Sequence, residues 1–514
     1  MDKHNKTEHF SKWRAILWPI YNYEIKKFLP MALIMFCFLF NYTVMRDTKD
    51  VLVVNAAGAH ITSFLKLYFV TPAAILFVIL YAKLCNALSK ENVFYAVIVP
   101  FLVFFGLFGF VIYPNIDILH PAAETVARLH TEYPNLGGFI DIYANWSFSL
   151  FYVMAEIWGS AMISLLFWQF ANQVTRMNEA KRFYPLFPLV ANLSLIFAGQ
   201  SEHFANNIQH YVDVSGNHYA LSLKILMTLV VLMGALAMYL YRWMHVKVLS
   251  DPFYYDEAEV SGKTKSKKPK LSLVESAKLI FSSPELGLIV LLVVSYGISI
   301  NLVELQWKHQ LKLYYAGDMS GYHAFMGNFS TFTGIFTMIF ILGVGANLLR
   351  SVSWFKAAVI TPLMILLCGA AFFIFILGRD GLEVMLSDAK LSAVAFAAFL
   401  GAGLIVFSKA VKYSLFDPTK EMAYIPLDDE LKTKGKAAVD VLGGRLGKAG
   451  GAFIQSTLAV VMATKDVAVM APITFGIFVI ICIIWLFAVQ GLGKKIHLAM
   501  KRKEEQAKVK AANA

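Results

Sequence analysis

The feature that most constrains this chain is a series of apolar runs, each near or above the roughly 20 residues that a helix needs to cross a bilayer. Twelve such runs follow one another along the 514 residues. We therefore expect an all-α polytopic membrane protein with twelve transmembrane helices. The expected spans are residues 28–48, 61–83, 93–113, 143–171, 183–201, 219–241, 285–307, 323–346, 355–377, 390–410, 438–462 and 470–491.

The composition agrees with a membrane protein and excludes several other classes. Apolar residues make up 58% of the chain and charged residues 16%, against about 45–50% and 25% in soluble domains. The same values exclude a disordered chain, collagen and a disulfide scaffold. The four cysteines lie in or beside apolar runs without C-x-x-C pairing, and the twelve histidines are scattered. We expect no disulfide, no metal site and no cofactor.

Basic residues outside the runs indicate how the chain crosses the membrane. Lys and Arg gather before the first run, between the sixth and seventh runs and after the last run, whereas residues 114–140 contain only Arg128. Since basic loops stay in the cytoplasm, we expect both termini there. The middle segment divides the spans into six and six, as in pseudo-symmetric major-facilitator-like bundles. The expected domains are a cytoplasmic N-terminal segment 1–27, an N-terminal six-helix bundle 28–241, a cytoplasmic linker 242–284, a C-terminal six-helix bundle 285–491 and a cytoplasmic basic tail 492–514.

Ionisable residues inside the expected spans are the main functional candidates, because each costs about 2.5–3.5 kcal/mol to insert. Glu156 has no cation within four residues, so it must meet a cation from another helix, a ligand or a proton. Glu304 and Lys308 have the spacing of an ion pair within one helix, and so do Arg46 and Asp50. Each charge has an alternative role, which is only to lock two helices together.

The string GGRLGKAGG in the eleventh expected span combines small residues with two cations. Gly443, Gly447 and Gly451 form a four-spaced stripe that favours close helix packing. Arg445 and Lys448 project together from the same helix, which favours binding of a polyanion. The string is not a P-loop, because its spacing is wrong and no Ser or Thr follows the lysine.

Basic residues outnumber acidic residues inside the expected spans. In a cavity of low dielectric constant this excess would attract an anion strongly, and a phosphorylated substrate fits it. Lys412 precedes the eleventh span in an expected loop, where it is either a solvated charge or part of an inner gate. The charged residues inside the spans are Arg46, Lys49, Glu156, Glu304, Lys308, Arg445 and Lys448.

Around these charges the sequence resembles the nucleotide transporter family, the ATP:ADP antiporters of obligate intracellular bacteria and plastids. The resemblance covers nearly the whole chain. Its most specific string is DPTKEMAYIPL, which is similar to the chlamydial ATP/ADP translocases. The matching strings are RDTKDVLVV at 46–54, AEIWGS at 155–160, VELQWK at 303–308, KYSLFDPTKEMAYIPL at 412–427 and GRLGKAGGAFIQ at 444–455.

The resemblance implies a transporter, not an enzyme, that imports ATP in exchange for ADP by alternating access, with or without inorganic phosphate. It implies a monomer in a bacterial inner membrane, with ATP and ADP as substrates and no nucleic acid partner. The family's important charges fall on Lys49, Glu156, Glu304 and Lys448. The full set of expected substrate-binding residues is Lys49, Glu156, Glu304, Lys448, Arg46, Arg445, Lys308, Asn301 and Lys412.

Two other functions stay open. One is a proton-coupled nucleotide or organic-anion symporter, with Glu156 or Glu304 as the proton carrier. The other is a polytopic membrane transferase, which would need a large loop with paired carboxylates. Residues 114–140 offer only Asp117, Glu124 and Glu132 for that purpose.

Overall fold

The computed structural model describes residues 18–208, 217–255, 283–345, 351–379, 392–424 and 443–512, together with the single residues 348, 381, 427 and 439. Helices are the only regular secondary structure in these ranges, as expected for an all-α membrane protein. Most of the expected N-terminal segment and most of the expected linker lie outside the described residues.

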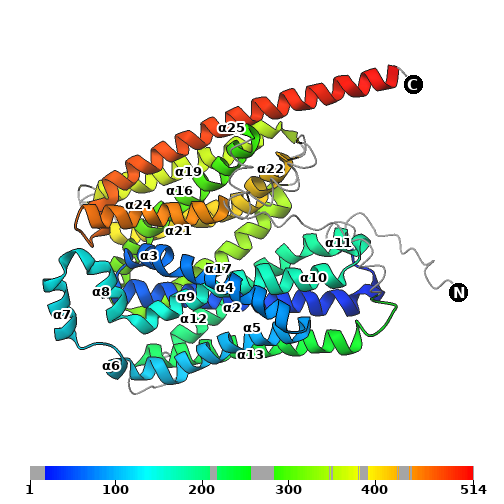
Figure 1. Cartoon of the computed structure of the whole chain (residues 1–514). Coiled ribbons are helices and arrows are strands. Elements are labelled where there is room, and N and C mark those ends of the chain that lie inside the picture. Colours follow the sequence, from blue (N-terminus) through cyan, green and yellow to red (C-terminus); the bar gives the residue numbers. More distant parts are fainter. Residues whose placement is uncertain are drawn as a thin grey trace.

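The helices of residues 22–247, called here the N-terminal group, lie side by side in the lower part of Figure 1. Shorter helices connect them, at one end α6 (Ile116–Leu119), α7 (Ala123–Glu132) and α8 (Gly137–Ala144), and at the other end α11 (Met177–Phe183). The long helices are α2 (Ile25–Ala57), α3 (Ile61–Phe64) continuing through η2 (Leu65–Val70) into α4 (Thr71–Ala87), α5 (Lys90–Leu107) continuing into η3 (Phe108–Ile112), α9 (Trp146–Trp158) continuing through η6 (Gly159–Phe167) into α10 (Trp168–Val174), α12 (Phe187–Asn207) and α13 (His218–Lys247).

The helices of residues 284–512, called here the C-terminal group, lie above them in Figure 1, with α17 crossing toward the N-terminal group. The two groups contact each other where α12 and α2 pack against α17, and where α3 packs against α24. The helices of this group are α16 (Pro284–Tyr315), α17 (Met319–Ile339) continuing into η9 (Phe340–Gly345), α19 (Trp354–Leu377), α21 (Ala393–Val411) continuing through η10 (Lys412–Phe416) into α22 (Asp417–Met422), α24 (Gly444–Val461) and α25 (Val467–Ala512).

Within the described residues, ten helices are long and apolar enough to cross a membrane. The fifth and eleventh expected spans are also helical, as α12 and α24, but they do not reach that hydropathy. α12 carries the fully buried Glu202, and α24 carries Arg445 and Lys448. Both helices pack against protein, α12 on α17 and α2, and α24 on α16 and α3. Polar residues are tolerated on such helices where they face protein or a water-filled cavity and not lipid.

Several helices extend beyond the expected spans. α2 continues to Ala57, so the RDTKD charges lie inside a helix and not at its outer end. Residues 412–422 are helical, although we expected a loop around Lys412. α25 continues through Ala512, past the expected start of the tail at residue 492, because the Lys, Glu, Gln and Ala residues that follow the last span favour a helix.

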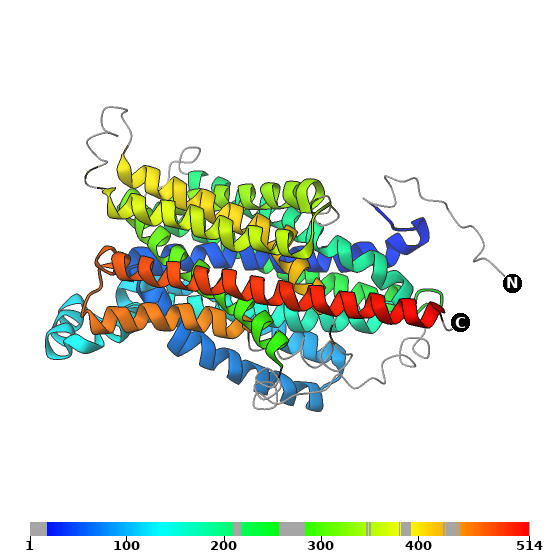
Figure 2. The ribbon, with the colours of Figure 1, turned by 90° about the horizontal axis from the view of Figure 1, so that it is seen from above.

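The two ends of the bundle differ in what they hold. α2 begins and α25 ends at one end, called here the terminal end, and Figure 2 shows the same arrangement from above. α3, α7, α8 and the connection between α24 and α25 lie at the opposite end, called here the far end. α16 and α24 therefore both run from the terminal end toward the far end.

Candidate functional site

The charged turn of α2 lies in the interior of the bundle. Asp47, Lys49 and Asp50 are 0%, 2% and 3% exposed. α2 is surrounded there by helices of both groups, because it packs against α9, α12, α13, α16 and α17. Charges buried to this extent must be paired within the protein, since an unpaired buried charge is strongly destabilising.

Lys49 pairs with two carboxylates at once. Its Nζ lies 2.8 Å from Asp50 Oδ1 and 3.2 Å from Glu156 Oε1 of α9. The same ammonium group lies 3.9 Å from the centroid of the Tyr152 ring, a favourable cation–π contact. Of the three partners left open for Glu156, the structure shows a cation from another helix.

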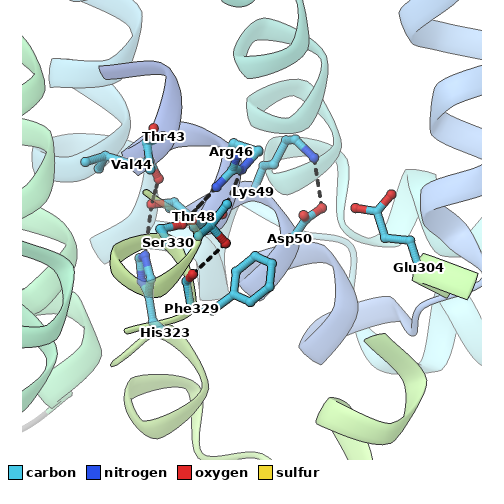
Figure 3. A network of polar contacts seen from close by, with 12 residues as sticks. Thr43, Val44, Arg46, Thr48, Lys49, Asp50, Glu304, His323, Phe329 and Ser330 are labelled. Atoms are coloured by element: carbon cyan, nitrogen blue, oxygen red, sulfur yellow. Dashed lines mark hydrogen bonds and ion pairs between the residues drawn. The ribbon is translucent and has the colours of Figure 1, made fainter. Parts of the chain in front are cut away.

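Asp50 joins the two groups of helices. Its Oδ2 lies 2.9 Å from Lys308 Nζ of α16. Lys308 also lies 3.0 Å from Glu304, which confirms the ion pair expected from their spacing. Figure 3 shows Asp50 of α2 and Glu304 of α16 facing each other, with Lys49 bonded to Asp50.

Lys66 is a further member that the sequence analysis missed. It lies in η2, where the helix widens into a π-turn, a feature that is frequent at functional sites. Its Nζ lies 3.6 Å from Glu304 and donates a hydrogen bond to Asn301 Oδ1 at 2.9 Å. The available signal was a lysine well inside the second apolar run, far from Lys83 at the end of that run. We call Lys49, Asp50, Lys66, Glu156, Glu304 and Lys308 the central cluster, in which three lysines face three carboxylates.

Arg46 does not pair with Asp50 as we expected. Its guanidinium lies 2.9 Å from Asp47 and donates to Ser330 of α17 at 2.9 Å. Ser330 in turn donates to Asp47 at 2.6 Å. The expectation was wrong because Asp50 is already held by two lysines, whereas Asp47 faces α17, where Ser330 completes its coordination.

Residues next to Glu156 and Glu304, in the strings AEIWGS and VELQWK, hold these two glutamates in place. The buried Trp158 donates to the carbonyl of Phe38 on α2 at 3.1 Å, and Trp307 donates to the carbonyl of Ala398 on α21 at 2.8 Å. A Cβ at Gly159, the first residue of η6, would lie 2.7 Å from the Tyr42 ring, so a larger residue there would displace that ring. These contacts fix the depth of Glu156 and Glu304 in the bundle.

The glycine stripe of α24 packs against α16, as expected. A Cβ at Gly447 would lie 3.0 Å from Gly297 Cα, and one at Gly451 would lie 2.6 Å from Asn301 Cβ. The backbones of α24 and α16 are therefore in close contact at Gly447 and Gly297. Lys448, the residue after Gly447, lies at the same depth in the bundle as Gly297. The Lys448 and Arg445 side chains are exposed, and neither forms an ion pair with a described residue. The carboxylate that attracts Lys448 most strongly is Glu156.

Lys412 lies apart from the central cluster. Its Nζ is 3.2 Å from Asp417 and 4.4 Å from the centroid of the Tyr413 ring, at the start of η10. The side chain is half-buried, so Lys412 is not a solvated loop charge. The structure thus brings together Lys49, Glu156, Glu304, Lys308 and Asn301, and leaves Arg46, Arg445, Lys448 and Lys412 around them.

A second charged cluster joins the two groups at the far end. Asp141 of α8 lies 2.8 Å from Lys465, 2.9 Å from His130 and 3.6 Å from His60. Burial would raise the pKa of Asp141, but the close contacts with His60, Lys465 and His130 outweigh it and hold that pKa below its usual value. Within the described ranges, no group of three or more His, Cys, Asp or Glu side chains is placed to hold a metal ion.

Comparison with known proteins extends the likeness to the whole chain. The sequence pattern of the TLC ATP/ADP transporter family matches residues 3–496. An ADP,ATP carrier protein of Chlamydia pneumoniae is 45% identical over 506 residues, covering 98% of this chain and 97% of that protein. One from Rickettsia prowazekii is 46% identical over 503 residues, covering 98% and 99%. A chloroplastic one from Arabidopsis thaliana is 44% identical and covers 95% and 77%.

Solved structures share the fold at low sequence identity. A bacterial homologue of the iron transporter ferroportin superposes with a TM-score of 0.59 at 11% identity, over 92% of this chain and 100% of that chain. A D-xylose–proton symporter gives 0.54 at 12% identity, over 92% and 97%. The fold is therefore that of polytopic, major-facilitator-like transporters.

Proposed function

This chain belongs to the TLC ATP/ADP transporter family, and we propose that it exchanges ATP for ADP across a membrane. The observation that carries the proposal is the match, over nearly the full length of both chains, to proteins named ADP,ATP carriers. The central cluster adds to it, because its lysines and carboxylates meet inside the bundle where a transported anion would pass.

We propose that the chain works by alternating access between an N-terminal and a C-terminal six-helix bundle. Lys465 and Asp141 join the two groups at the far end, and Ser63 bonds Gln455 there at 2.6 Å. The basic segments favour cytoplasmic termini, which places the far end outside. The state described here is then closed on the outside. We place the protein in a bacterial inner membrane as a monomer.

The expected binding residues keep their proposed role, led by Lys49, Glu156, Glu304 and Lys448. In the empty carrier the buried pair between Asp50 and Lys308 holds the two bundles together. Phosphate oxygens of an arriving nucleotide would compete with the carboxylates for these lysines. The two bundles can then change their relative position only while a nucleotide replaces these ion pairs. Each return step therefore needs a bound nucleotide, which makes the exchange strict. The other proposed contacts are Arg46, Arg445, Lys308, Asn301 and Lys412.

Inorganic phosphate is a second proposed export substrate. ATP moving in against ADP carries about one extra negative charge inward, against a membrane potential worth about 2.3 kcal/mol per 100 mV. Phosphate leaving with ADP offsets that charge. Release of labelled phosphate from liposomes during ATP uptake measures this directly.

Reconstituted protein tests the exchange. Liposomes loaded with ADP should take up labelled ATP, whereas liposomes without internal nucleotide should not. Protein with Lys49→Ala is the matched variant and should take up little ATP in ADP-loaded liposomes. Equal uptake by loaded and empty liposomes would contradict exchange. Uptake into empty liposomes that follows an imposed pH gradient would instead support a proton-coupled symporter, although Glu156 and Glu304 are both paired with lysines here.

A further inference from the structure

Lys409 is a charge inside α21 that neither the sequence motifs nor the proposed mechanism uses. It lies within a span of 30 residues, Ala393–Met422, and its side chain is half-buried. Its Nζ lies 4.8 Å from the centroid of the Phe329 ring, and it forms no ion pair with a described residue. A ring face supplies about 0.5–2 kcal/mol, which is less than the insertion cost of a lysine, about 2.5–3.5 kcal/mol.

The charges around Lys409 do not compensate it. The charges that act most strongly on it are Arg46 and Asp47 of α2, and Glu304 and Lys308 of α16. These are two cations and two carboxylates, and each is already paired, Arg46 with Asp47 and Lys308 with Glu304. The central cluster is also balanced, with three lysines and three carboxylates. Lys409 and Lys448 are thus lysines without a carboxylate partner among the described residues.

Lys409 and Lys448 stand at the same depth in the bundle. Ser408, the residue before Lys409, lies 3.3 Å from the Tyr296 hydroxyl. Gly447, the residue before Lys448, packs against Gly297. Tyr296 and Gly297 are consecutive on α16, so the backbones of both lysines lie about two helical turns from Glu304. The Lys409 side chain reaches back from there, because its ammonium group lies over the Phe329 ring, which packs on Trp307. Since α16 runs toward the far end, both backbones lie on the terminal side of the central cluster.

We propose that Lys409 binds phosphate oxygens of the transported nucleotide, together with Lys448, on the terminal side of the central cluster. This inference rests on the proposed exchange of ATP for ADP. An ammonium group without a carboxylate partner can bind an anion without first breaking an ion pair, whereas Lys49 and Lys308 cannot. A nucleotide entering from the terminal end meets Lys409 and Lys448 before it reaches the paired lysines.

Nucleotide binding to purified Lys409→Gln protein tests this assignment. The dissociation constants of ATP and ADP should both rise by about 10- to 100-fold, because one charged hydrogen bond is lost. Lys409→Arg should keep most of the affinity, since it keeps the charge. Lys356→Gln is the control, because it removes an exposed lysine of the same helical group, at the start of α19. It should bind ATP as the unchanged protein does.

A purely structural role for Lys409 predicts a different result. Removing an uncompensated charge should leave the unfolding temperature of the empty protein unchanged or raise it, whereas losing a structural contact would lower it. The assignment is overturned if Lys409→Gln binds ATP like the unchanged protein, or if its unfolding temperature falls. If the unchanged protein binds neither ATP nor ADP, the proposed exchange fails and this inference fails with it.

Discussion

The central cluster and the two lone lysines on α21 and α24 place positive charge in the same bundle in opposite ways. Lys49 and Lys308 each contact two carboxylates and are 2% exposed. Lys409 and Lys448 form no ion pair with a described residue. The Lys409 side chain is half-buried, and the Lys448 side chain is exposed. The difference separates charges that hold the protein together from charges that await an anion.

The largest expected effect is the loss of a paired charge. Asp50→Asn leaves three lysines of the central cluster facing two carboxylates, and should lower the free energy of unfolding by about 3–5 kcal/mol. Denaturation of the purified protein measures this, with Asp117→Asn on the exposed α6 as the control. Adding Lys308→Gln restores the balance of charges and should recover part of the loss. If Asp50→Asn alone is as stable as the unchanged protein, the charges of the central cluster do not hold the protein together.

Removing an unpaired charge should act on ligand binding alone. Lys448→Gln should leave the unfolding temperature of the empty protein unchanged and raise the dissociation constant of ATP by about 10- to 100-fold. Thermal unfolding with and without ATP measures both quantities in one experiment. A fall in stability comparable to that of Asp50→Asn would mean that Lys448 is a structural charge too.

The smallest effect is expected at the far end, where a paired charge is close to solvent. The Lys465 side chain is 49% exposed, so Asp141→Asn should cost only about 0.2–1 kcal/mol at neutral pH. Because its contacts with Lys465 and the two histidines hold the pKa of Asp141 below its unfolded value of about 3.9, this stabilisation is present above about pH 4 and disappears as the pH falls through the folded-state pKa. Unfolding curves of the two proteins should differ at neutral pH and converge in acid. If the difference in unfolding free energy between the two proteins persists in acid, the contribution of Asp141 is not ionic.

Much of the fold follows from apolar run length, because a helix that must cross a bilayer needs about 20 apolar residues. The runs located every long helix in the described residues, including α12 and α24. Run length could not place the ends of the helices. Once a helix leaves the membrane it continues wherever residues favour it, as α25 does past residue 491.

The candidate site was predictable where its chemistry is local. Glu304 and Lys308 are four residues apart, and Glu156 stood alone in an apolar run, so one pair and one missing partner could be inferred. The pairing of Asp50 with Lys308 could not, because it depends on how the two groups of helices pack. Lys66 and Lys409 were overlooked because neither has an oppositely charged neighbour at helical spacing, and only three-dimensional packing shows that one is paired and the other is not.

The unbroken length of α25 has a mechanical consequence. Its 46 residues make a rod about 69 Å long at about 1.5 Å per residue, whereas a bilayer with its head groups is about 40–45 Å thick. A large part of the rod therefore stands outside the membrane at the terminal end, and Figure 1 shows α25 extending past the other helices of the C-terminal group. The protruding part is a rigid extension of the C-terminal group and moves with it. If that group rocks, the C-terminal end of α25 moves through a larger distance than any residue within the bundle. A spectroscopic probe attached near that end would therefore report the rocking motion as a larger displacement.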